Sequence, residues 1–363
     1  MKKIITLVLV LAMVAATAVG CAQPAGTPAP PAAPAAEAPA TEAPPESPAA
    51  EAPAVPDVPL PDEGDVAAMA YSEKPIEIKF LSYSNNPFWD QINEGLYAAI
   101  DYLAKFNCTV TPVDMGSEAD GKTLADYIET LMLQEPAGIV ACPMSDGTEA
   151  YIDKAVAAGI TVVTYLSEST NQGDTRIAFS GSDAVAGGEA AAQAIADYTG
   201  GKGTVGVITG YLTMNQHEER RLSMTNKLKE LCPDITILEP VEAHDSTTET
   251  YDAAVNLITA YPDLKAIYCT AGGPFGAAQA VKDQGKTGQI GVVCFDWVPD
   301  NVNYVKTGEI VAAISQDPQA MAFNAILMAY NNAVTGWKPD EVIQRTKSDI
   351  LTPENISQKL PNA

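Results

Sequence analysis

The chain has 363 residues, of which 47% are hydrophobic, and its 46 acidic against 21 basic residues give a formal net charge of -25. Setting aside a terminal leader and a Pro/Ala-rich stretch leaves roughly 290 residues, which is enough for two α/β lobes with complete cores. The sequence has no stripe of Lys and Arg that could displace counterions from a polyanion. The composition therefore argues against nucleic acid as a partner.

The N-terminus has the charge order of a secretory signal. Lys2 and Lys3 precede an apolar run, residues 4–16, that is too short to span a bilayer as a mature helix. The run ends at Ala18-Val19-Gly20-Cys21, which resembles the lipobox of bacterial lipoproteins, where the Cys receives a diacylglycerol. We expect residues 1–21 to be a lipoprotein signal peptide that attaches the protein to the membrane through Cys21. An ordinary cleaved signal with an incidental Cys is the alternative.

Residues 22–75 are rich in Pro, Ala and Glu and contain almost nothing large and apolar, so they cannot form a core. Proline restrains φ and the acidic charges repel one another, so this segment is expected to be a disordered, semi-stiff tether with a reach on the order of 100–150 Å. Such a reach is most useful across a thick cell wall. The expected location is therefore the outer face of the membrane in a Gram-positive-type cell rather than a periplasm.

Five further cysteines follow Cys21, and an odd number cannot all pair with one another. Cys142, Cys269 and Cys294 end short β-branched runs, where a free thiol behaves as a small buried hydrophobe. None of the five shows metal-ligand spacing. We therefore expect neither a metal nor a cofactor.

From Ile76 onward, short apolar runs alternate with segments of helical period, and the pattern occurs twice. The first series predicts strands at 76–81, 108–113, 138–142, 161–165 and 176–179, with helices at 87–106, 124–134 and 148–158. The second predicts strands at 204–209, 235–239, 266–270 and 291–295, with helices at 185–198, 215–231, 250–260 and 275–284. This alternation is typical of an α/β fold with two doubly wound parallel-sheet lobes. A ligand is expected beyond the carboxyl ends of the strands, in a cleft between the lobes.

Five segments, in this order, resemble the ribose- and galactose-type periplasmic sugar-binding proteins, the type I solute-binding proteins of ABC transporters. They are Ser84-Asn85-Asn86-Pro87-Phe88-Trp89, Asp183-Ala184-Val185-Ala186-Gly187-Gly188, Glu219-Arg220, Phe295-Asp296 and Ile314-Ser315-Gln316. The resemblance covers residues 76 to about 352. It implies a monomer that holds a monosaccharide-like ligand and passes it to ABC permease subunits.

The same resemblance implies a three-segment hinge near Gly181-Ser182, Gln316-Asp317 and Lys347-Ser348. One lobe would then comprise residues 76–182 plus 317–347. The other would comprise residues 183–316 plus 348–363.

A pyranose ring offers apolar faces to aromatic side chains and a rim of hydroxyls to planar polar groups. The resemblance assigns these roles to Asn86, Phe88, Trp89, Arg220, His244, Asp296 and Gln316. Each has a plainer alternative: the aromatic pair could pack a helix on the sheet, Arg220 could be a solvated helix charge, Asp296 a helix N-cap, and His244 a surface loop residue.

Two positions depart from the pattern of the sugar binders. Leu166-Ser167 stands where an Asp-Arg pair is usual, and Ala271-Gly272-Gly273 stands where an Asn is usual. Buried groups left without partners would lower affinity, so the ligand is expected to differ from ribose, galactose or glucose in its hydroxyl pattern or a substituent.

Catalysis is not expected. The sequence has no Gly-x-Ser-x-Gly elbow, no Gly-rich phosphate loop with Lys, and only two His residues. A repressor effector domain is not expected either, because the leader is expected to export the chain and no DNA-binding helices precede the body. Two alternatives stay open: a non-sugar ligand such as a polyol, a nucleoside or a signalling molecule, and presentation of the ligand to a membrane sensor.

Overall fold

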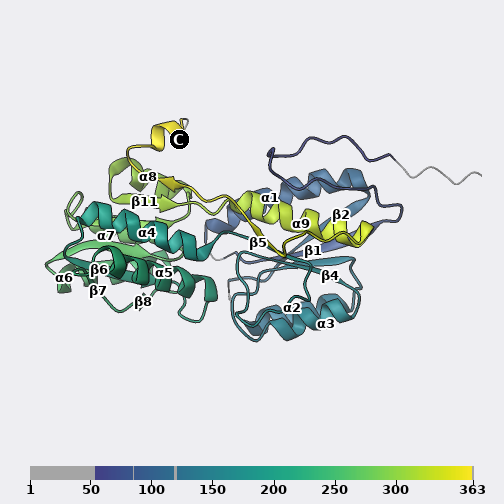
Figure 1. Ribbon diagram of the computed structural model, residues 1–363, viewed down its shortest axis with the longest axis horizontal. Coiled ribbons are helices and arrows are strands. Elements are labelled where there is room, and N and C mark those ends of the chain that lie inside the picture. The colour runs from purple at the N-terminus through teal and green to yellow at the C-terminus, as the bar shows by residue number, and fades with distance from the viewer. Residues whose placement is uncertain (1–53, 85, 118–120, 362–363) are drawn as a thin grey trace, which may run out of the picture. The chain divides into compact units, whose positions relative to one another are not determined.

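The computed structural model of the protein describes residues 54–84, 86–117 and 121–361 (Figure 1). These residues belong to one compact unit of the chain. Cys21 and the first part of the expected tether, residues 22–53, lie outside the described residues. Within the described ranges, no helix is long and apolar enough to cross a membrane.

The first sheet has the strand order β12-β5-β4-β3-β1-β2, and all of its described strand pairs are parallel. Its strands are β1 (Ile76–Ser82), β2 (Cys108–Asp114), β3 (Gly138–Ala141), β4 (Thr161–Tyr165), β5 (Ala178–Gly181) and β12 (Ile343–Arg345). The accompanying helices are α1 (Phe88–Leu103), α2 (Gly121–Met132), α3 (Glu149–Ala157) and α9 (Pro318–Thr335), with a 3-10 turn at Ala104–Phe106. Every residue of β3 and β4 is buried, because helices cover the sheet.

The second sheet repeats this order as β13-β11-β10-β9-β6-β7, with β8 paired to β6. Its strands are β6 (Thr204–Thr209), β7 (Thr236–Ile237), β8 (Val241–Glu242), β9 (Leu264–Cys269), β10 (Gly291–Phe295), β11 (Ile310–Ile314) and the antiparallel β13 (Ile350–Leu351). The accompanying helices are α4 (Ala184–Thr199), α5 (Asn215–Leu231), α6 (Thr247–Ala260), α7 (Pro274–Asp283), α8 (Pro299–Thr307) and α10 (Ile356–Lys359). The predicted α/β fold with two doubly wound parallel sheets is confirmed.

The strand predicted at 235–239 is instead two short strands. β7 pairs with the start of β6, at Thr204 and Val205, and β8 pairs with its end, at Ile208 and Thr209. Pro240 lies between them. Because proline has no N–H group, it interrupts the ladder of hydrogen bonds and separates the two pairings.

The chain passes between the sheets three times: from β5 into α4, from β11 into α9, and from β12 into β13. Hydrogen bonds hold these crossings side by side. The Thr346 amide donates to the Gly181 main-chain oxygen (3.1 Å), and the Thr346 hydroxyl donates to the Gln316 main-chain oxygen (2.7 Å). The Ser315 amide donates to the Asp349 main-chain oxygen (2.8 Å). The crossings lie where the resemblance implies the hinge.

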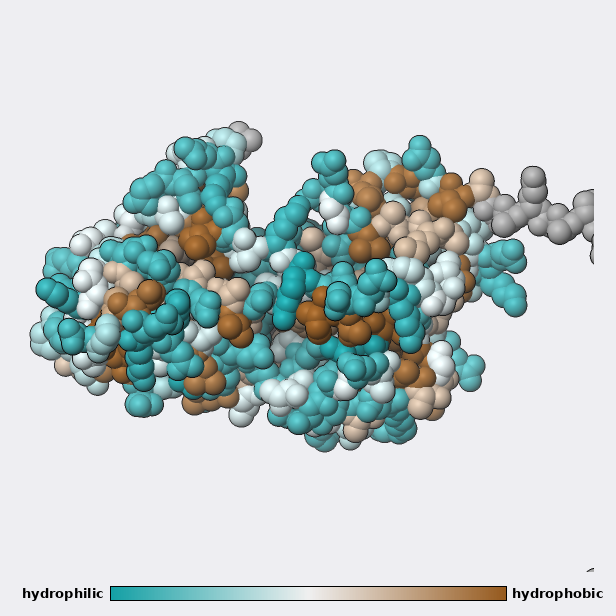
Figure 2. All heavy atoms as spheres, in the orientation of Figure 1, coloured by the Kyte–Doolittle hydropathy of each residue, from teal (hydrophilic) through white to brown (hydrophobic). Residues whose placement is uncertain are grey.

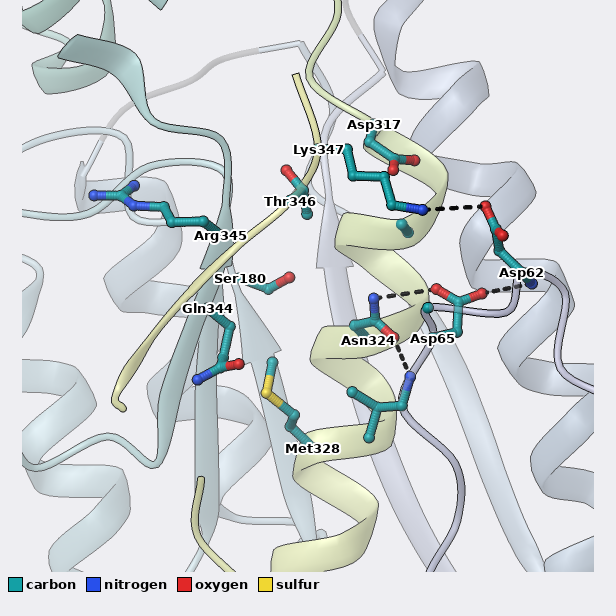
Figure 3. A pocket seen from close by; sticks show the side chains of 13 residues that line it. Asp62, Asp65, Ser180, Asp317, Asn324, Met328, Gln344, Arg345, Thr346 and Lys347 are labelled. Carbon is teal, nitrogen blue, oxygen red and sulfur yellow. Dashed lines mark hydrogen bonds and ion pairs between the residues drawn. The ribbon is translucent and has the colours of Figure 1, made fainter. Parts of the chain in front are cut away.

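The structure differs from the expected disordered segment 22–75 in its last part. Residues 58–72, called the strap below, lie along α9, which is apolar on nearly every face and therefore needs cover on the side away from the sheet. The Val66 amide donates to Asn324 Oδ1 (2.7 Å) and the Met69 amide donates to Asn331 Oδ1 (2.9 Å). Figure 3 shows Asn324 of α9 reaching the strap beside Asp65. The folded body therefore begins earlier than residue 76.

The cysteines behave as their positions predict. Cys142, Cys269 and Cys294 are buried and free, and burial raises the pKa of Cys269 to about 12.

Outside the cores, hydrophilic side chains cover most of the face seen in Figure 2, with hydrophobic residues in small groups.

Candidate functional site

A cavity of about 40 Å³ lies among the loops that follow the strands of both sheets. Its lining residues are Asn86, Phe88, Trp89, Met144, Leu166, Met214, Gln216, His217, Arg220, Asp245, Ala271, Gly272, Asp296 and Gln316. They follow β1, β3 and β4 of the first sheet and β6, β8, β9, β10 and β11 of the second. In both sheets the strand order reverses beside β1 or β6, which is where doubly wound sheets bind ligands. The volume suits only a few water molecules, so a larger ligand requires the walls to separate.

The structure brings six of the seven predicted site residues into this lining: Asn86, Phe88, Trp89, Arg220, Asp296 and Gln316. Among the described residues, no group of three His, Cys, Asp or Glu side chains is arranged to hold a metal ion. The lining side chains offer hydrogen bonds, charge and aromatic contact.

Arg220, Gln316 and Asp296 form one chain of hydrogen bonds. Arg220 is 2% exposed, and its guanidinium donates through Nη2 to Gln316 Oε1 and through Nη1 to the Thr270 oxygen (3.0 Å). Gln316 Nε2 in turn donates to Asp296 Oδ1 (2.6 Å). The guanidinium carbon lies 3.9 Å from the centroid of the Phe295 ring. Arg220 is thus a fixed, buried cation and not a solvated helix charge.

Asp296 occupies a strained position directly after β10. Its φ is 75°, in the left-handed region that favours glycine. The side-chain amide of Asn301 holds the backbone in this conformation by donating to the Asp296 main-chain oxygen (2.9 Å). Burial raises the pKa of Asp296, and Arg220 and Gln316 oppose that rise. The N-cap of α8 is Val298, so Asp296 does not have the capping role that was its alternative.

The aromatic pair serves both packing and the cavity. Phe88 and Trp89 are nearly buried, with ring centroids 5.7 Å apart in an edge-to-face contact. Asn86 fixes the start of α1, because its Oδ1 accepts a hydrogen bond from the Phe88 amide (3.0 Å). Both rings therefore pack against the core and also line the cavity.

The structure does not place His244 in the lining. Its side chain is 50% exposed, and its Nδ1 lies 2.7 Å from the Glu249 carboxylate, which raises the pKa of His244. His244 and Asp245 have φ values of 48° and 57°. This turn of the backbone brings Asp245 into the cavity lining in place of its neighbour.

Asp245 is held by the loop after β9. Its Oδ1 accepts a hydrogen bond from the Gly272 amide (3.1 Å). Burial, with a smaller effect of Asp296, raises the pKa of Asp245 to about 6. The sequence offers no local signal for this residue, because its loop has no regular spacing.

The sequence analysis also did not predict Gln216 and His217 as site residues, although their spacing from Arg220 in the sequence could have indicated them. Both lie one helical turn before Arg220 on the predicted helix 215–231, so they share its face. His217 Nδ1 accepts a hydrogen bond from the Tyr211 amide (3.2 Å), and burial lowers the pKa of His217 to about 3, which leaves the ring neutral. Gln216 Nε2 donates to the Leu166 oxygen (2.8 Å), from the second sheet to the first.

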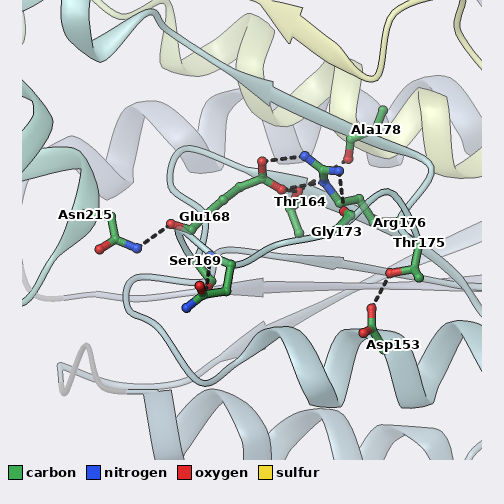
Figure 4. A network of polar contacts seen from close by, with 10 residues as sticks. Asp153, Thr164, Glu168, Ser169, Gly173, Thr175, Arg176, Ala178 and Asn215 are labelled. Carbon is green, nitrogen blue, oxygen red and sulfur yellow. Dashed lines mark hydrogen bonds and ion pairs between the residues drawn. The ribbon is translucent and has the colours of Figure 1, made fainter.

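The loop after β4, where the resemblance would place an Asp-Arg pair, presents a main-chain oxygen instead. Leu166 has a φ of 64° and offers its oxygen to Gln216. A buried ion pair holds the loop: Arg176 Nε lies 2.6 Å from Glu168 Oε1 (Figure 4). Asn215 Nδ2 donates to the Glu168 oxygen (2.8 Å), which adds a second link between the sheets.

Comparison with known proteins agrees with this arrangement. The D-allose-binding periplasmic protein of Escherichia coli is 29% identical over 260 residues, covering 69% of this chain and 81% of that protein. The ribose import binding protein of Salmonella typhimurium is 27% identical over 265 residues, covering 73% and 86%. A solved carbohydrate transporter solute binding protein from Agrobacterium radiobacter, in complex with D-arabinose, superposes with a TM-score of 0.72 at 22% identity, covering 80% of this chain and 98% of that one.

The periplasmic binding protein domain matches residues 80–336. That range includes both sheets' central strands, the lining residues and the first two crossings. The chain belongs to the periplasmic binding protein family.

Proposed function

We propose that this protein captures a monosaccharide between its two sheets outside the cytoplasm and delivers it to an ABC permease. The observation that carries the proposal is the chain Arg220, Gln316 and Asp296, which shares one cavity with Trp89. A fixed cation, a carboxylate and an aromatic face are the groups that a sugar ring needs.

The roles follow from the chemistry of each group. Asp296 accepts hydrogen bonds from ring hydroxyls, and Arg220 donates to ring oxygens through its Nε, which is buried and lacks a hydrogen-bond acceptor among the described residues. Trp89 and Phe88 cover an apolar face of the ring. Relatives named for allose and ribose support a monosaccharide as the ligand class.

Delivery requires a switch between open and closed forms. Three crossings connect the sheets, and the lining comes from both, so a ligand that touches both sides stabilises the closed form by its differential affinity. A permease that recognises the closed form would then receive only loaded protein.

We further propose that the protein is anchored on the outer face of the membrane by a lipid on Cys21. The small residues before Cys21 and the Pro/Ala-rich segment after it support this location. Cys21→Ser should release the protein from the membrane fraction without changing its affinity for ligand. Retention of the variant in the membrane fraction would contradict the anchor.

Calorimetry on the purified protein tests the ligand class. D-allose, D-ribose and D-arabinose are titrated in parallel with xylitol and uridine, after a thermal-shift screen of the same compounds, since ligands that bind only the native state raise its melting temperature. We expect at least one monosaccharide to bind more tightly than the polyol and the nucleoside. Preference for xylitol or uridine over every monosaccharide would overturn the proposal.

A further inference from the structure

Among the described residues that line the cavity, two carry carboxylates and one carries a permanent positive charge. Asp245 and Asp296 contribute the carboxylates and Arg220 the cation, while His217 is neutral because burial lowers its pKa to about 3. Arg220 donates to the Thr270 oxygen and to Gln316, and no ion pair joins it to either carboxylate in the described part of the chain. The cavity therefore carries an excess negative charge when both carboxyls are ionised.

Asp245 lies in a place that two glycines leave open. A Cβ atom at Gly210 would lie 2.2 Å from Asp245 Oδ1 and 2.7 Å from His217 Cε1. A Cβ atom at Gly272 would lie 3.3 Å from the Asp245 Cβ and 3.0 Å from Asn86 Nδ2. Any side chain at Gly210 would therefore displace the carboxylate. The loops after β6 and β9 are built to accommodate it.

The Asp245 carboxylate has capacity left for a ligand. Among the described residues, the Gly272 amide is its one hydrogen-bond donor, whereas an ionised carboxylate accepts about four hydrogen bonds. A neutral ligand that seals the cavity would leave this charge without a counter-charge at low dielectric, which is costly. A ligand ammonium group would supply both the counter-charge and the donors.

Two other features favour a cation. The chain has a formal net charge of -25, which draws positively charged ligands toward it. Trp89 lines the same cavity, and an indole ring attracts a cation that lies over its face.

We infer that the preferred ligand is a monosaccharide bearing a protonated amine, with the amine at Asp245 and the hydroxyls at Arg220 and Asp296. This inference rests on the proposed function. It identifies the substituent by which the ligand differs from common neutral sugars, which the departures at Leu166-Ser167 and Ala271-Gly272-Gly273 led us to expect.

The test compares matched pairs by calorimetry at pH 7 on the purified full chain. The probes are 2-amino-2-deoxy-D-glucose, -galactose and -allose, each beside its neutral parent hexose and its N-acetyl derivative. We expect at least one amine to bind about tenfold or more tightly than both of its neutral partners. In Asp245→Asn, this preference should fall to about one. Asp252→Asn, which removes an exposed carboxylate from α6, should leave it unchanged.

The outcomes separate the two proposals. If neutral hexoses bind as tightly as their amines, the inference is wrong and the monosaccharide proposal stands. If the amines retain their preference in Asp245→Asn, Asp245 is not the amine partner and the inference also fails. If no member of any series binds, the inference fails, and the monosaccharide proposal is then decided by the titrations with D-ribose and D-arabinose. Because the wild-type ratios alone decide the first outcome, the test does not depend on the variant's folding.

Discussion

Gln316 determines what Arg220 and Asp296 can still offer a ligand. Its side-chain Oε1 accepts hydrogen bonds from Arg220, Gln216 (3.3 Å) and Ser182 (3.2 Å), and its Nε2 donates to Asp296 Oδ1. The Nε of Arg220 is buried and has no hydrogen-bond partner among the described residues. One side chain at a crossing between the sheets therefore orients both charged groups in advance.

Removing either charged group should weaken binding strongly. Hydrogen bonds to charged groups contribute about 1.5–3 kcal/mol each, so Arg220→Ala or Asp296→Ala should raise the Kd of the tightest-binding monosaccharide by about tenfold to more than a hundredfold. Calorimetry measures the Kd, with circular dichroism as the check on folding. Arg221→Ala is the matched control, because Arg221 pairs with Glu218 on its own helix (2.7 Å). Near wild-type affinity in both cavity variants would place the site elsewhere.

Asp245 should make the stability of the ligand-free protein depend on pH. Its pKa is about 6 in the folded protein and about 3.9 in an unfolded chain, so the folded state binds this proton more tightly. That contribution to stability is complete below about pH 4 and is lost as the pH rises through about 6. The Asp245→Asn variant avoids this loss of stability. Because Asp245 is partly exposed and solvent screens its charge, we expect the variant to be more stable than wild type by only about 1–2 kcal/mol at pH 8, with little difference at pH 4.

Urea unfolding of the two proteins at pH 4 and pH 8 measures this difference. Groups that titrate in both proteins cancel in the comparison. Asp252→Asn serves as the control, because it removes an exposed carboxylate from α6, the helix that begins just after Asp245. An equal stability difference at both pH values would show that Asp245 titrates like an ordinary surface carboxyl.

The family resemblance, carried by motifs in a fixed order along the chain, led us to expect Asn86 after β1 and Asp296 after β10 in the site. Both line the cavity, because residues that directly follow parallel strands meet at one edge. Asp245 was not expected there, since two consecutive residues with positive φ decide which of them enters the cavity. Neither residue type requires that conformation, so the sequence does not encode the choice locally.

At the scale of elements, hydrophobic period predicted the alternating strands and helices, and helix 215–231 has the predicted bounds. What period could not predict was the effect of Pro240 on a short edge strand, or the docking of the strap. The strap's few apolar residues are diluted by the Pro- and Ala-rich composition around them. Its place depends instead on Asn324 and Asn331, which lie more than two hundred residues away on α9.

Asn331 should be the residue that secures the strap. It is fully buried, its Oδ1 accepts a hydrogen bond from the Met69 amide, and its Nδ2 donates to the Ala67 main-chain oxygen (2.9 Å). Its side chain thus supplies to the strap's main chain the hydrogen bonds that a neighbouring strand would otherwise supply. Asn331→Ala leaves two strap main-chain groups without partners and should destabilise the protein by about 1–3 kcal/mol. Limited proteolysis should then cut within residues 58–72 before the body. Asn303→Ala, exposed on α8, is the control, and an uncut strap in Asn331→Ala would contradict this role.

At the scale of the whole molecule, ligand binding should change the distance between the sheets. The cavity of about 40 Å³ is smaller than a monosaccharide needs, so entry requires an open form and binding restores a closed one. Small-angle scattering should therefore give a smaller radius of gyration with saturating ligand than for the open form present without it. An identical radius of gyration in both conditions would argue against movement about the three crossings.

With the lipid anchor that we propose at Cys21, the strap would also decide which half of the molecule bears a mechanical load from the membrane. Its hydrogen bonds run to α9, and its apolar residues join the core of the first sheet, so any pull on the chain before residue 58 enters through that half alone. The second sheet and its helices would move freely, because the pull does not pass through the crossings. An anchored molecule should consequently open and close as easily as a free one. The half built on the first sheet would be held by the anchor, and the half built on the second sheet would be available to the transporter.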